Sequence, residues 1–169
     1  MTSAADFAQH SKVLHTMTVD FARAVPDDRW HFTPAPPSAP RQVTDTGRPS
    51  PRPSAFSKQL RHVVCVRGVY NDALALGEVD WSASHSHYAG PLEREPLLEA
   101  LARQQDRLLE LLSSVDPGIT IDWDGFPYSF DLFAGEFVQH ESIHHGQWSV
   151  YAAVGGFDTP TSWHDMWGL

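Results

Sequence analysis

Residues 131–154 read DLFAGEFVQHESIHHGQWSVYAAV, and this stretch decides the fold. Large side chains recur in it every three or four positions, which is the spacing of one face of an α-helix. Gly155 and Gly156 follow, and glycines at that point are typical of a helix end. The stretch therefore predicts a helix with two imidazoles on its buried side. That side comprises Phe133, Phe137, His140, His144, Trp148 and Tyr151.

Three other stretches show the same spacing, and together they predict an all-α fold. They cover residues 3–24, 54–76 and 92–114, and proline or glycine follows each of them closely. Residues 119–130 alternate around an Asp-Gly pair at 124–125, which predicts either a small hairpin before the last helix or an ordered loop that covers a site. Four long amphipathic helices with so little strand signal favour an antiparallel four-helix bundle.

A proline-rich connection separates the first two predicted helices. Residues 34–54 hold seven of the thirteen prolines, a composition that suits neither helix nor strand. We expect a mobile, extended connection there, with a functional lid or a partner-binding arm as the alternative. Residues 158–169 form a C-terminal tail in which Trp163 and Trp167 could pack back onto the bundle. A chain of 169 residues suits a single domain, 1–169, that includes both segments.

Composition narrows the classes of partner. The net charge of −9 argues against nucleic acid, because phosphate binding needs a basic face, and it gives little attraction to anionic membranes. No apolar run reaches the roughly 18 residues of a transmembrane helix. Cys65 is the only cysteine, and residues 1–6 lack the pattern of a signal peptide. The expected location is the cytoplasm.

The histidines indicate a metal site. His140 and His144 lie one helical turn apart, so both could bind one divalent ion. The third ligand should come from another helix, and His62 is the candidate because it lies among valines of the second helix. His10 and His15 on the first helix compete with it, but they fit the solvent edge better. Three neutral imidazoles leave a coordination position open, which is typical of catalytic sites.

The roles of the remaining histidines and of the only cysteine are less defined. His85 and His87 lie in a loop, where a spacing of two suits a ligand pair. We expect His145 at the edge of the bundle, bonded to solvent or to a carbonyl group. Cys65 reads as a small buried apolar side chain, with a reactive or metal-linked thiol as the alternative.

Other side chains of the last helix would surround the imidazoles. Glu136, Glu141 and Gln147 are candidates to orient the second ring nitrogen of a ligand. We expect aromatic side chains to line a pocket beside the site. These are Phe133, Phe137, Trp148 and Tyr151.

The letters H-E-x-x-H at 140–144 also permit a zincin-type peptidase. Glu141 would then be the general base for a zinc-bound water. A zincin needs a third ligand downstream, for which only His164, Asp158 and Asp165 are available. The longer metzincin pattern fails, because Gln147 occupies its glycine position.

Two segments resemble the DinB/YfiT-like superfamily of metal-binding four-helix bundles. The first is FSKQLRHVVCVRGVY, residues 56–70, where the family places a histidine on its second helix. The second is HESIHHGQWSVY, residues 140–151, which is similar to the family's H-x-x-x-H-H-x-G-Q helix. The chain departs from the pattern in two places. Gly146 follows His145 directly, and the proline-rich segment interrupts the compact arrangement of the family.

The resemblance implies a metal triad at His62, His140 and His144, with zinc or nickel as the divalent ion, and a homodimer. Some relatives of this kind act as thiol S-transferases with low-molecular-weight thiols such as bacillithiol or mycothiol, and others are isomerases or have no known activity. The expected function is therefore a metal-dependent transferase or hydrolase acting on a small-molecule substrate. A non-enzymatic, stress-associated metal-binding bundle is the alternative.

Overall fold

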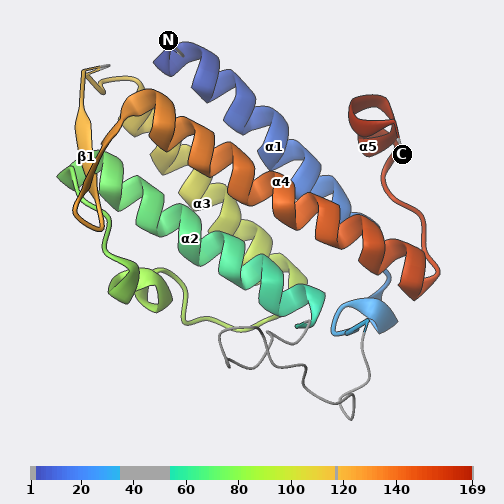
Figure 1. Cartoon of the computed structure of the whole chain (residues 1–169). Coiled ribbons are helices and arrows are strands. Elements are labelled where there is room, and N and C mark those ends of the chain that lie inside the picture. Colours follow the sequence, from blue (N-terminus) through green and yellow to red (C-terminus); the bar gives the residue numbers. More distant parts are fainter. Residues whose placement is uncertain (1–2, 35–53, 117, 169) are drawn as a thin grey trace, which may run out of the picture.

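The computed structural model describes residues 3–34, 54–116 and 118–168. Four long helices lie side by side in it (Figure 1): α1 Ala4–Ala24, α2 Phe56–Leu76, α3 Arg94–Leu112 and α4 Phe130–Gly155. The predicted all-α four-helix bundle is confirmed. The proline-rich connection falls almost entirely on residues 35–53, which lie outside the described residues. No helix in the described ranges is long and apolar enough to cross a membrane.

The helices begin and end where local chemistry allows. The Ser3 hydroxyl accepts a hydrogen bond from the Asp6 backbone N–H at 3.0 Å and caps the start of α1. Gly77 ends α2 and Gly156 ends α4, both in the left-handed region with φ of 79° and 71°. Glycine adopts this conformation without the steric cost of a Cβ, so the sequence predicts these ends well.

A small hairpin precedes α4, as one of the two sequence interpretations predicted. Strands β1 Thr120–Trp123 and β2 Phe126–Ser129 pair antiparallel. Asp124 and Gly125 between them have φ of 52° and 87°, as a two-residue type I′ turn requires. Two short 3-10 helices complete the described connections, η1 Asp27–Arg29 and η2 Trp81–His87.

The C-terminal tail packs back onto the bundle through a short helix, α5 Thr161–Trp167. Trp163 is fully buried, and its indole N–H donates to the Met17 carbonyl oxygen at 2.9 Å. Trp167 remains 45% exposed, so one of the two predicted tryptophan anchors is used.

The connection between α2 and α3 determines the direction of the helices. Leu60 and Leu97, near the starts of α2 and α3, share one apolar cluster, whereas Tyr70 and Leu108, near their ends, share another. The two helices are therefore parallel and not antiparallel as predicted, because residues 77–93 return along the bundle between them (Figure 1). The pairs α1 and α2, and α3 and α4, are antiparallel, as the sequence predicts for neighbours in the chain.

The core is divided into two apolar clusters by a layer of buried polar side chains. Phe21, Phe56 and Trp148 belong to the first cluster, and Phe7 and Phe137 to the second. In this layer a hydrogen-bonded network joins four side chains, one from each long helix, and each of the four is at most 4% exposed. We call these four residues the polar layer: Ser11, Arg67, Gln105 and Glu141.

Helix η2 packs directly on α2 at Gly68. The His87 ring occupies the space where a side chain at position 68 would lie, and its Nε2 is 3.4 Å from a carboxylate oxygen of Asp72 on the same helix. Glycine is thus needed here for close approach and not for backbone conformation.

Replacing Gly68 with alanine should displace η2. The new Cβ would lie 2.2 Å from Cγ of His87. Overpacking of about 1–3 kcal/mol should outweigh the gain in helix propensity of about 1 kcal/mol. We expect a lower free energy of unfolding in urea and faster proteolysis within 81–87. Gly135→Ala is the control, because its Cβ would meet nothing within 4 Å and should stabilise α4. Equal stabilisation by both variants would contradict the packing argument.

Candidate metal centre

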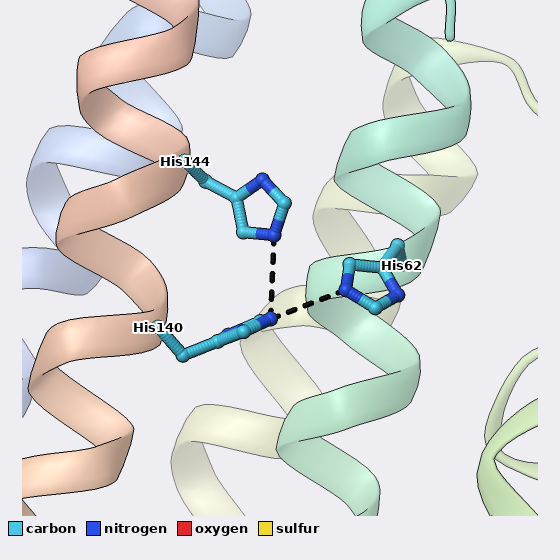
Figure 2. Close-up of side chains that lie close together, drawn as sticks. All are labelled: His62, His140 and His144. Atoms are coloured by element: carbon cyan, nitrogen blue, oxygen red, sulfur yellow. Dashed lines mark hydrogen bonds between the residues drawn. The ribbon is translucent and has the colours of Figure 1, made fainter. Parts of the chain in front are cut away.

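Three imidazoles converge between α2 and α4. His62 extends from α2 toward His140 and His144 on α4 (Figure 2). Nε2 of His140 lies 3.2 Å from Nε2 of His62 and 3.3 Å from Nε2 of His144. All three nitrogens fall within 4.8 Å of one another. In the part of the chain that the structure describes, this is the one cluster of three His, Cys, Asp or Glu side chains whose donor atoms meet in this way.

The spacing of the nitrogens fits a metal ion. Two nitrogens at about 2.1 Å from one ion lie about 3.4 Å apart in tetrahedral and about 3.0 Å apart in octahedral coordination. The observed separations of 3.2 and 3.3 Å lie between these values. Two of the three separations therefore match those of nitrogens bound to one ion, and the cluster could hold a metal ion.

All three imidazoles are in the neutral form that binds metal, because desolvation lowers the pKa of each ring even though His62 is exposed. Desolvation, then the neighbouring imidazoles, lower the pKa of His140 to about 3. Desolvation and His62 lower the pKa of His144 to about 4. The pKa of His62 is also lowered, by desolvation and then by His85. At neutral pH each ring can thus present a nitrogen lone pair.

Gln147 orients one of the rings. Its Oε1 lies 3.0 Å from Nδ1 of His144, so that nitrogen donates a hydrogen bond and Nε2 is left as the acceptor that faces the cluster. Gln147 follows His144 by three residues, and the helix brings the two side chains together. Of the three side chains expected to orient a ligand ring, Gln147 has such a contact.

Glu141 is not placed as the general base that the motif H-E-x-x-H indicates; it is the ion-pair partner of Arg67. It is 1% exposed and belongs to the polar layer. Arg67 donates to both carboxylate oxygens, from Nε at 2.5 Å and from Nη2 at 2.7 Å. Burial alone would raise the pKa of Glu141, but the Arg67 charge and hydrogen bonds outweigh it and hold this pKa below its usual value. A carboxylate engaged on both oxygens is unsuited to act as a general base.

Gln105 of the polar layer and His15 on α1 complete the hydrogen bonding of Arg67. Its Nη1 lies 3.0 Å from both Oε1 of Gln105 and Nδ1 of His15. Gln105 donates in turn to the Ser11 hydroxyl at 3.1 Å. His15, expected at the solvent edge, is therefore half-buried against Arg67. The sequence could not predict this contact, because the pattern of α1 does not show that Arg67 of α2 lies against it.

His145 is also buried, so the prediction of a bundle-edge histidine is wrong. It is 2% exposed, its Nε2 lies 2.8 Å from the Thr18 hydroxyl, and its ring packs 4.9 Å from that of Trp163. Trp163 of α5 covers it; the sequence predicts that this tail packs on the bundle, but not that it packs on His145. His164, a ligand in the zincin alternative, is exposed and contacts Thr159 instead.

The other sequence candidates lie outside the cluster. His10 is exposed on α1, as expected. His87 packs against α2 at Gly68, and His85 lies near His62 without joining its ring nitrogens in the cluster. Cys65 is buried, and burial raises the pKa of its thiol, in agreement with the small apolar interpretation.

The predicted aromatic pocket is not present where we expected it. Phe133, Phe137 and Trp148 are fully buried in the two apolar clusters, and Tyr151 is 5% exposed. Their side chains fill the bundle interior, so they stabilise the helix that carries the imidazoles, and none of them is among the described residues that line a cavity next to His62.

The metal-free protein should lose stability as the pH falls from about 6.5 to about 4. Desolvation lowers the pKa of His145 to about 4 in the folded protein, whereas the unfolded chain binds a proton near 6.5. The contribution of His145 to the free energy of unfolding is therefore fully present above pH 6.5. It is lost as the pH falls from 6.5 to about 4, by up to about 3 kcal/mol. Urea unfolding with a chelator at several pH values measures it. In His145→Gln the free energy of unfolding should change less steeply with pH. An unchanged pH dependence would show that His145 is not its source.

Comparisons with known proteins agree with this architecture. A profile described as the DinB superfamily matches residues 12–148. No curated protein matches the sequence.

Solved structures of DinB-like proteins are similar in fold. One from Bacillus cereus has a TM-score of 0.66 at 15% identity, covering 94% of this chain and 97% of its own. YjoA from Bacillus subtilis has 0.61 at 14%, covering 91% and 94%. A putative DinB family member from Exiguobacterium sibiricum has 0.59 at 18%, covering 92% and 93%. At such low identity the likeness concerns the fold alone.

Proposed function

The chain belongs to the DinB superfamily, and from this premise we propose that His62, His140 and His144 bind one divalent metal ion, zinc or nickel. The observation that carries the proposal is the convergence of three neutral imidazole nitrogens at separations near those of metal ligands. Imidazole suits both ions, and three protein ligands leave at least one coordination position for another molecule.

We further propose that the protein is a metal-dependent thiol S-transferase or hydrolase for small molecules. A bound ion of this kind lowers the pKa of a water or thiol ligand and so supplies a nucleophile at neutral pH. The protein contributes the orientation of His144 through Gln147. The three rings stay neutral because desolvation lowers the pKa of each of them. A low-molecular-weight thiol is the proposed cosubstrate.

Metal loading tests the first part of this proposal. Dialysis against zinc or nickel, followed by elemental analysis, should give one ion per chain in the wild type and a large loss in His62→Ala. His10→Ala is the matched control, because His10 is exposed and outside the cluster. Equal metal content in wild type and His62→Ala would overturn the assignment.

A second assay separates an enzyme from a non-enzymatic metal-binding bundle. The metal-loaded protein is mixed with a low-molecular-weight thiol and an aromatic halide, and thioether formation with release of halide is followed. Metal-dependent turnover supports the transferase. Full metal loading without turnover of thiols or hydrolysable esters would favour the non-enzymatic alternative.

We also propose that the protein forms a homodimer through an exposed face of α4. Large apolar side chains recur on this face and are more than half exposed: Leu132, Ile143, Val150 and Val154. Exposed apolar side chains that recur on one helix face are typical of an interface.

Charges on this face should dissociate the dimer. We expect the double variant Ile143→Glu, Val150→Glu to sediment as a monomer, because burying two carboxylates in an apolar interface is unfavourable. Leu76→Glu is the control, since Leu76 is 72% exposed at the end of α2. A wild type that sediments as a monomer at all concentrations would contradict the proposal.

A further inference from the structure

A cavity adjoins His62 between α2 and η2. It measures about 170 Å³, and its walls include Lys58, Arg61, His62, Trp81 and His85. A cavity of roughly 150 Å³ can already admit benzene. The space is therefore large enough for a small organic molecule.

The walls of this cavity carry positive charge, although the net charge of the chain is negative. Lys58 and Arg61 contribute two cations, and no aspartate or glutamate is among the residues that line the cavity. The protein as a whole carries a net charge of −9. The thiol of Cys65, which also lines the cavity, is neutral because burial raises its pKa. Local charge thus favours an anion against the background of the molecule.

These two cations are not used in ion pairs among the described residues. Arginines elsewhere pair with carboxylates. They are Arg29, Arg67, Arg94, Arg103 and Arg107. Lys58 and Arg61 have no such partner within 4.0 Å in the described ranges, although they lie one helical turn apart on the same face of α2. Both charges are therefore free to face a ligand.

The same cavity has an aromatic side chain, Trp81, among its lining residues. Trp81 is 37% exposed, and its ring is held in place by the edges of Tyr70 at 6.1 Å and Trp123 at 5.6 Å. A rigid aromatic face beside two cations is suited to a molecule with an apolar body and a charged end.

We propose that this cavity binds the carboxylate or phosphate group of a small anionic molecule at Lys58 and Arg61, with the apolar part of that molecule against Trp81. Because His62 is a wall of the cavity and also a member of the cluster, the bound molecule lies next to the candidate metal centre. The identification of this molecule as the substrate rests on the proposed function; its binding does not.

Matched ligands test the charge requirement. Benzoate and benzamide have nearly the same shape, and only benzoate carries a charge. Titration calorimetry on the chelator-treated protein should show benzoate binding at least tenfold more tightly than benzamide, and the difference should shrink at high salt. Phenyl phosphate and inorganic phosphate, titrated in parallel, distinguish a preference for carboxylate from one for phosphate. Equal affinity for benzoate and benzamide would overturn the proposal.

Matched variants test the location. Lys58→Gln combined with Arg61→Gln should weaken benzoate binding at least tenfold, whereas Arg23→Gln, an exposed cation on α1, should leave it unchanged. Both residues of the double variant are at the surface, so folding should be retained, and circular dichroism checks this. Unchanged benzoate affinity in the double variant would overturn the assignment.

The same titrations separate this inference from the proposed function. If benzoate binds as expected but no divalent ion is retained, the anion site stands and the metal function fails. If zinc binds at the cluster but benzoate binds no better than benzamide, the metal proposal stands and the anion site fails.

Discussion

Replacing Arg67 with alanine should lower the free energy of unfolding by about 3–5 kcal/mol, the largest effect we expect from a single substitution. Arg67 is 2% exposed and Glu141 is 1% exposed, so the variant would leave a carboxylate buried without its cation. Gln105 and His15 would lose a partner at the same time. Urea unfolding of the metal-free protein at pH 7.5 measures the change.

A double variant distinguishes the unpaired charge from the loss of packing. Arg67→Met combined with Glu141→Leu removes both charges and keeps apolar volume, and such replacements are often neutral or stabilising. We expect it to be several kcal/mol more stable than Arg67→Ala. If the single variant costs less than about 1 kcal/mol, the ion pair does not contribute as the geometry indicates.

Zinc should stabilise the wild type strongly and the variant His140→Ala very little. At a free zinc concentration of 1,000 times Kd, binding to the folded state alone adds about 4.1 kcal/mol. His140 lies within 3.3 Å of both other imidazole nitrogens, so its removal leaves only two of three ligands. An affinity loss of about 1,000-fold would reduce the stabilisation below about 0.5 kcal/mol at the same zinc concentration.

Thermal unfolding with and without zinc measures this difference. His85→Ala is the control, because His85 lies near His62 but outside the cluster. Without metal, His140→Ala should unfold close to the wild-type temperature, since the variant relieves the crowding of desolvated imidazoles. An equal zinc shift in wild type and His140→Ala would contradict the assignment of the ligand.

The spacing of apolar residues predicted the helices, because a helix that buries one face needs apolar side chains every three or four positions. The spacing of four between His140 and His144 placed them on one side of α4, and the valines around His62 indicated a second helix in the core. The structure brings these three side chains together. Local sequence was sufficient here because each part of the cluster depends on the face of a single helix.

The sequence could not predict features that depend on which helices meet. Glu141 and His145 each lie one position after a member of the cluster, yet both face the interior and contact Arg67 and Thr18. Helical spacing gives the direction of a side chain but not its partner. The parallel arrangement of α2 and α3 likewise depends on the path of residues 77–93, which carries no periodic signal.

The polar layer has a consequence for how far the helices can slide along one another. A shift of one turn, about 5.4 Å, would move Arg67 away from Glu141 and into apolar surroundings. The two apolar clusters alone would tolerate such a shift better, because their contacts have no fixed direction. The pair Arg67 and Glu141 therefore sets the register of α2 relative to α4 along the bundle axis. This register brings His62 on α2 level with His140 and His144 on α4, although Arg67 and Glu141 are not part of the imidazole cluster.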